Sequence, residues 1–132
     1  MSTEKNKWID AVAKLLKLTQ DGDLAWSFQE PPVSFTKRPN SRVDVVFVAK
    51  YGDKLLRLYE KRFQEDVIDF DEFQLRQVMT TEWKKTVVLE FIDGNGNSLW
   101  VFPYVQALND LVSSAQYQVA GVKDFLAELL AS

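Results

Sequence analysis

The stretch RVDVVFVAKYGDKLLRLYEKRF, residues 42–63, decides the fold class. Apolar residues fill both sets of alternating positions in its first half, from Val45 to Ala49, which is typical of a strand that lies centrally in a sheet. Tyr-Gly-Asp at 51–53 then supplies a tight turn with a permissive glycine. Leu56 and Leu58 alternate with larger polar residues in the returning half. The stretch therefore predicts an antiparallel hairpin.

Further along the chain, KKTVVLEFI and SLWVF predict two more strands, joined by a segment with Asp93, Asn95 and Asn97 at alternate positions. Many calcium loops begin with that spacing, but a loop of the EF-hand type also needs glycine at position six and glutamate at position twelve. Counted from Asp93, these positions hold Ser98 and Tyr104. Asp-Gly and Asn-Gly are typical of hairpin turns. We therefore predict a turn and no metal site.

Helical periodicity marks both ends of the chain. Residues 4–20 place apolar side chains on one arc, as a helix packed on a sheet does, and Thr3 is a candidate N-cap. Pro103 suits the first turn of a second helix, and a third from about residue 119 carries a broad apolar face. This order predicts one α+β domain over residues 1–132. Its antiparallel sheet of about five to six strands is expected to lie beneath an N-terminal helix and two C-terminal helices.

Composition excludes several kinds of chemistry. The 132 residues include no Cys and no His. Disulfides, thiolate nucleophiles, imidazole bases and the usual zinc ligands are therefore absent. An enzyme would have to rely on carboxylates, Lys or Tyr. We predict that the protein is not an enzyme and needs no cofactor.

Charge and hydropathy narrow the choice of partner and compartment. The net charge is -3, with the cations scattered, which opposes binding to nucleic acid. No apolar run is long enough to span a membrane, and the first ten residues lack the apolar centre of a signal peptide. We expect a cytoplasmic protein that binds neither nucleic acid nor membrane.

Residues 64–83 break the strand pattern, and a short helix and an irregular excursion both fit them. Long irregular connections in compact domains are often functional. We predict a partner-binding surface here, with apolar anchors and an acidic rim suited to a basic protein. Its members are Asp69, Phe70, Asp71, Glu72, Phe73 and Trp83. Two alternatives stay open: the aromatics plug the end of the sheet, or the carboxylates form a solvated face, hold Mg²⁺ or do acid–base work.

Two motifs carry a family resemblance. LLKLTQDGDLAW at 15–26 and IDGNGNSLW at 92–100 resemble a layout found in small bacterial proteins of unknown function. Those proteins pair an LLxLTxxGxLxW helix–strand with an xDxxGxxLW hairpin and a helical tail. The resemblance covers the two ends of the chain better than residues 33–80. It implies a bacterial cytoplasmic origin and carries no activity.

These observations favour a small non-enzymatic protein-interaction module of the adaptor, immunity or chaperone-like kind. Its partner would be another protein or a second copy in a homodimer. The alternative is a binder of a small apolar or amphipathic ligand, held in a cavity between the sheet and the helices. Carboxylate-based catalysis ranks third and nucleic-acid binding last.

Overall fold

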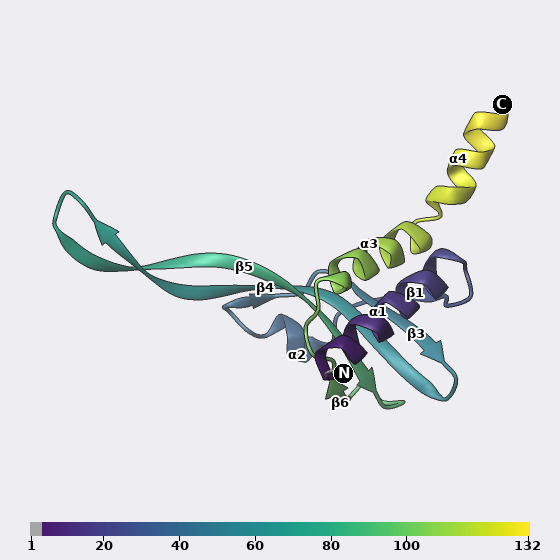
Figure 1. Ribbon diagram of the computed structural model, residues 1–132, viewed down its shortest axis with the longest axis horizontal. Helices are drawn as coiled ribbons and strands as arrows, with labels where there is room; N and C mark the ends of the chain where they lie inside the picture. The colour runs from purple at the N-terminus through teal and green to yellow at the C-terminus, as the bar shows by residue number, and fades with distance from the viewer. Residues whose placement is uncertain (1–3) are drawn as a thin grey trace.

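The computed structural model describes residues 4–132 and confirms the α+β architecture, so the expected cap at Thr3 lies outside the described residues (Figure 1). An N-terminal helix precedes a six-stranded antiparallel sheet, and two C-terminal helices follow it. The elements are α1 (Glu4–Gln20), β1 (Trp26–Gln29), α2 (Val33–Thr36), β2 (Ser41–Arg42), β3 (Val46–Tyr51), β4 (Lys54–Asp71), β5 (Arg76–Ile92), β6 (Ser98–Val101), α3 (Ala107–Val119) and α4 (Val122–Ala131).

The sheet grows outward from the predicted hairpin. Strands β3 and β4 pair antiparallel from Val46↔Tyr59 to Tyr51↔Lys54, and Gly52 takes a positive φ of 60° in the turn between them. The strand order is β1-β3-β4-β5-β6, with β2 beside β4. The predicted turn after β5 is also present, because Asp93 and Asn97 close it and Gly96 has a φ of 84°.

The main core lies between one face of the sheet and the helices α1 and α3, which run side by side across it (Figure 1). Phe47 is 5% exposed and Leu89 is fully buried, so both lie beneath the helices. The side chains with the least exposed surface come from both layers: Val12, Leu24, Leu58, Leu89, Leu108 and Leu111. Apolar burial from two packed layers accounts for the stability of such a domain.

A smaller cluster covers the opposite face of the sheet. Val43, Val46 and Tyr59 are buried there, and Phe35 from α2 packs against them. The Phe35 and Tyr59 ring centroids lie 4.9 Å apart. The short helix α2 therefore shields the centre of the second face.

Helix α4 departs from the expectation that both C-terminal helices cover the sheet. Gly121 has a left-handed φ of 69° after α3, a common way to end a helix, and α4 then leaves in a new direction (Figure 1). None of the residues of α4 is buried. Its apolar side chains, including Phe125, Leu129 and Leu130, are instead exposed.

Among residues 4–132, no helix is long and apolar enough to cross a membrane.

Candidate functional site

A two-stranded arm projects from one end of the sheet (Figure 1). Strands β4 and β5 pair without a break from Leu55↔Ile92 to Asp71↔Arg76. Their neighbours stop much earlier: β3 reaches Tyr59, β2 reaches Phe63, and β6 meets β5 only from Glu90 onward. Beyond Phe63 the two strands have only each other as partners. We call residues 64–83 the arm.

The regular pairing of the arm corrects the prediction for residues 64–83. The segment is neither a short helix nor an irregular excursion, since Gln64↔Trp83 through Asp71↔Arg76 are in continuous register. The turn at its tip is held by the Asp71 carboxylate, which accepts the N–H groups of Phe73 and Gln74 at 2.9 and 3.3 Å. The arm has no buried residue. Because neither face of the arm joins the core, its sequence alternates apolar and acidic residues only over the short run from Ile68 to Asp71.

One side of the arm carries four large apolar side chains. Because successive side chains of a strand point to opposite faces, the cross-strand pairs define one face that follows the twist of the ribbon. Its members are Gln64, Asp66, Ile68 and Phe70 from β4, with Trp83, Thr81, Met79 and Gln77 opposite them on β5. Ile68, Phe70, Met79 and Trp83 are 65%, 56%, 69% and 54% exposed. We call this the apolar face of the arm, and Asp66 is its single ionisable group.

The other side of the arm is mostly charged. Four carboxylates, those of Glu65, Asp69, Asp71 and Glu82, share it with Val67, Val78, Thr80 and the one arm cation, Arg76. Lys84 at the base forms an ion pair with Glu65, with 2.7 Å between Nζ and Oε2, and the hydrogen bond that Lys84 donates to this carboxylate raises the pKa of Lys84. An acidic face therefore backs the apolar face of the arm.

Charge also changes along the length of the ribbon. The arm holds six carboxylates and one cation, whereas Lys61, Arg62, Lys84 and Lys85 form a cationic base immediately below it. Arg62 also forms an ion pair with Asp44, and a hydrogen bond from Arg42 together with both cations lowers the pKa of Asp44. The ribbon is therefore acidic at the tip and basic at the base.

The predicted site residues are divided among the two faces and the tip of the arm. Phe70 and Trp83 lie on the apolar face, whereas Asp69 and Asp71 lie on the acidic one. Glu72 and Phe73 form the tip, where Phe73 is 100% exposed. The aromatics therefore do not plug the end of the sheet, which overturns that alternative.

Ile68 and Met79 were missing from the predicted site. They pair directly across the arm next to Phe70, and the Asp66–Thr81 pair separates them from Trp83 on the same face. The signal was present in the alternation of Asp66, Ile68 and Phe70 along β4. This alternation predicts a shared face only when the register with β5 is known, because the register determines which side chains of the two strands lie on the same side.

The Asp93 carboxylate serves the turn between β5 and β6. Its Oδ1 accepts the N–H groups of Asn95 and Asn97, both at 2.9 Å, and its Oδ2 accepts the Asn97 side-chain amide at 3.2 Å. These bonds, chiefly those from Asn97, lower the pKa of Asp93. Within residues 4–132 no group of three or more acidic side chains is placed to hold a metal ion.

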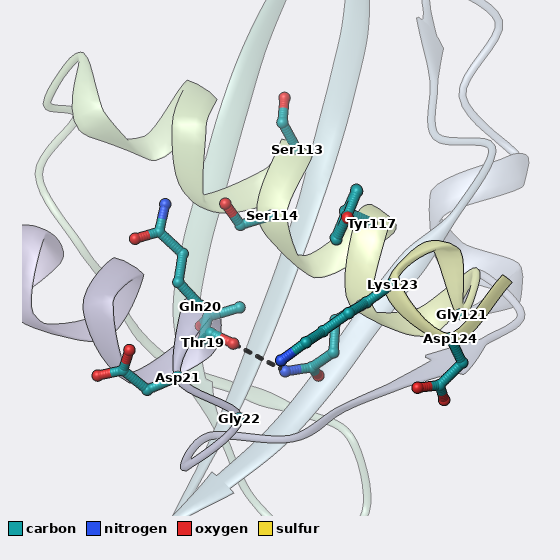
Figure 2. A pocket seen from close by; sticks show the side chains of 11 residues that line it. Thr19, Gln20, Asp21, Gly22, Ser113, Ser114, Tyr117, Gly121, Lys123 and Asp124 are labelled. Atoms are coloured by element: carbon teal, nitrogen blue, oxygen red, sulfur yellow. Dashed lines mark hydrogen bonds between the residues drawn. The ribbon is translucent and has the colours of Figure 1, made fainter. Parts of the chain in front are cut away.

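A hollow of about 560 Å³ lies where the ends of α1 and α3 meet the start of α4 (Figure 2). Gln118 at its floor joins α3 to the turn after α1. Its amide nitrogen donates to Thr19 O at 3.1 Å and Leu24 O at 2.9 Å, and its amide oxygen accepts Trp26 N–H at 2.7 Å. These bonds occupy the buried polar groups, while the charged side chains at the rim are exposed. The hollow is therefore a structural junction, and the arm is the better candidate site.

Comparisons with known proteins return no match: no protein-family model, no curated protein and no solved structure matches this chain.

Proposed function

We propose that the protein is a non-enzymatic protein-interaction module and that the arm is its partner-binding surface. The apolar face of the arm supports this proposal. Four large side chains, Ile68, Phe70, Met79 and Trp83, are each more than half exposed, although Trp83 at the base of the arm lies beside Phe35 and Pro39. Contiguous exposed apolar surface on a domain commonly marks a binding site.

The low intrinsic stability of a two-stranded ribbon also supports a partner-binding role for the arm. An isolated two-stranded hairpin is only marginally stable in water. Burying one large apolar side chain contributes about 1.5–3 kcal/mol, although association first costs translational and rotational entropy. Trp83 and Phe70 are of the aromatic type that supplies interface hot spots. A partner that covers the apolar face would therefore stabilise the arm in its extended form.

The charges around the apolar face indicate the kind of partner. Six carboxylates on the arm would repel an acidic surface and attract a basic one. Such charges act mainly on association rate and on the choice of partner, whereas the apolar contacts supply affinity. We infer a basic protein surface as the partner and the cytoplasm as the place of action, in an adaptor, immunity or chaperone-like role.

The alternative of a ligand cavity between sheet and helices receives less support. Leu58, Leu89, Leu108 and Leu111 fill that interface and are at most 1% exposed. The grooves on the two sides of α3 are bordered by Glu60 and several hydroxyl or amide side chains. The structure gives no observation that favours an apolar ligand over a protein partner.

The experiment compares two double variants of the arm. Ile68→Ser with Met79→Ser removes the centre of the apolar face, and Val67→Ser with Thr80→Ser changes the adjacent cross-strand pair on the acidic face. Both variants should melt within a few degrees of the wild type, because none of the four residues is buried. Affinity capture from native cell extract, with mass spectrometry and size measurement, should show a bound protein or a second copy for wild type and control. The proposal fails if the Ile68/Met79 variant retains every such partner.

A further inference from the structure

The charge pattern along the β4–β5 ribbon is complementary to itself when one copy is reversed. Asp69, Asp71 and Glu72 cluster at the tip, and Arg62 and Lys85 lie as a cross-strand pair at the base. About 33 Å separates these ends, since ten residues of strand rise by about 3.3 Å each. If a second ribbon lies antiparallel to the first, the acidic tip of each copy lies against the cationic base of the other.

Resting on the proposed function, we propose that the arm binds a second copy of this chain. The two arms pack antiparallel, apolar face against apolar face, about a two-fold axis. Such an interface uses the same patch of both copies and closes on itself, which is the usual geometry of homodimers. The basic surface that the acidic arm requires is then supplied by the chain's own base.

The register of the ribbon fixes which residues meet. With the axis between the Asp66–Thr81 and Ile68–Met79 pairs, each copy's Ile68–Met79 pair lies over the partner's Asp66–Thr81 pair and next to the partner's Ile68–Met79 pair. Trp83 then lies level with the partner's Phe70, which is on the adjacent strand. The next step brings Arg62 and Lys85 to the partner's Glu72. Each large apolar side chain therefore has an apolar neighbour in the partner, the Asp66 carboxylate lies near the axis, and Glu72 meets the two cations.

Pairing through strand edges is the competing arrangement of two copies, and the sequence disfavours it. The free edge of β4 carries Glu65, Asp66, Asp69 and Asp71, so two such edges would repel each other. The free edge of β5 is less acidic, but pairing there leaves the apolar face in water. Face-to-face packing covers that surface and separates the acidic faces on the outside of the assembly.

The interface is small, and this determines the expected affinity. A ribbon two strands wide has a footprint of about 10 Å by 33 Å, or about 330 Å² on each copy. Standard interfaces bury about 800 Å² on each partner. We therefore expect a dimer in the micromolar range that weakens at high salt, because exposed charge pairs are screened.

The first test is analytical ultracentrifugation of the full chain from about 1 μM to 1 mM, with melting curves to verify folding of every variant. The wild type and the Val67→Ser/Thr80→Ser control should show a concentration-dependent dimer. Ile68→Ser with Met79→Ser should weaken it at least tenfold. An edge-paired dimer would survive this change, and that outcome overturns the face-to-face arrangement.

The second test reverses the charges at one end at a time. Arg62→Glu with Lys85→Glu makes both ends of the interface acidic, and Glu72→Lys makes both ends basic. Each variant alone should lose the dimer, whereas an equimolar mixture should form a heterodimer at wild-type concentration. The Arg62–Asp44 ion pair is exposed and contributes little to stability, so both variants should fold. Recovery in the mixture also excludes misfolding as the cause of the loss.

Two different failures remain distinguishable. If the wild type stays monomeric at 1 mM while the arm still captures another protein through Ile68 and Met79, the self-pairing inference is wrong and the proposed function stands. If the arm variants alter neither self-association nor capture, both are wrong.

Discussion

Arg57 and Glu90 lie directly opposite each other on β4 and β5 and form a buried ion pair, with 3.0 Å between Nη2 and Oε1. Arg57 Nη1 also donates to Gly96 O at 2.8 Å, and the guanidinium lies 4.9 Å from the centre of the Phe35 ring. Tyr59 donates its hydroxyl hydrogen to Glu90 Oε2 at 3.3 Å. The pair therefore joins the central hairpin, the turn after β5 and helix α2. It lies on the face of the sheet that carries the smaller cluster, opposite α1 and α3.

Removing one member of this pair should be costly. Glu90→Ala leaves the guanidinium buried without its counter-charge, and we expect a loss of about 3–5 kcal/mol in the free energy of unfolding. Arg57→Met combined with Glu90→Leu removes both charges and should cost less than Glu90→Ala alone. Urea denaturation of the three variants measures the difference. Equal losses in the single and double variants would contradict this account.

Tyr59 should make stability fall at high pH. Burial and the adjacent Glu90 carboxylate raise the pKa of Tyr59 to about 12. The unfolded chain loses this proton near pH 10 and the folded chain near pH 12, so the folded state holds more protons in between. Stability is therefore unaffected by this group below pH 10 and declines between pH 10 and 12, by up to about 1.4 kcal/mol per pH unit. The decline should be smaller in Tyr59→Phe than in the exposed control Tyr51→Phe, measured by urea unfolding at each pH.

Gln118 should contribute more to stability than a half-exposed amide normally does. Gln118→Ala leaves the N–H of Trp26 and the carbonyls of Thr19 and Leu24 without their partner at a largely buried junction. Each unsatisfied buried group costs about 1–3 kcal/mol, with water offsetting part of this. We expect a loss of about 2–4 kcal/mol in chemical denaturation. Gln116→Ala on the same helix is exposed and is the matched control.

The arm should be dispensable for folding of the rest of the domain. Replacing residues 65–82 by Asn-Gly closes the ribbon at the Gln64↔Trp83 pair and removes no buried side chain. The unfolding free energy of this shortened chain should stay within about 1 kcal/mol of the wild type, whereas Phe47→Ala should cost about 3–5 kcal/mol. Thermal melts at low protein concentration compare the two. Unfolding of the shortened chain would place the arm in the folding core.

Calcium should leave the protein unchanged. The Asp93 carboxylate already accepts three hydrogen bonds within its own turn. We therefore expect millimolar calcium to leave Tm nearly unchanged, since only a ligand that binds the native state raises stability. A rise that saturates at micromolar calcium and is lost in Asp93→Ala would establish a metal site.

The sequence predicted those parts of the fold that bury a face. The β3–β4 hairpin and α1 impose a strand or helix period on their residues, because one side must be apolar to join the core. The order of elements then follows from short antiparallel connections. The turn at Asp93 was also recognisable, since few residue types tolerate a positive φ.

The arm and the position of α4 escaped prediction for the opposite reason. Neither buries a residue, so no core contact is encoded in their sequence, although the apolar periodicity of α4 did predict a helix. Phe70 and Trp83 were chosen as site residues from their type alone. Their place on one face with Ile68 and Met79 depends on a long register that no local signal specifies. The left-handed Gly121 that redirects α4 was likewise indistinguishable from any other glycine in a loop.

The continuous β4–β5 ribbon has a consequence for how this protein could evolve. Leu58↔Leu89 in the core and Ile68↔Met79 in the arm lie on the same side of one ribbon, ten residues apart. A one-residue insertion in either strand between them would leave the core in place and turn the inserted strand's arm side chains over. An insertion in both strands would exchange the apolar and acidic sides of the whole arm at once. Partner choice could therefore switch through two single-residue insertions, without any change to the residues that hold the domain together.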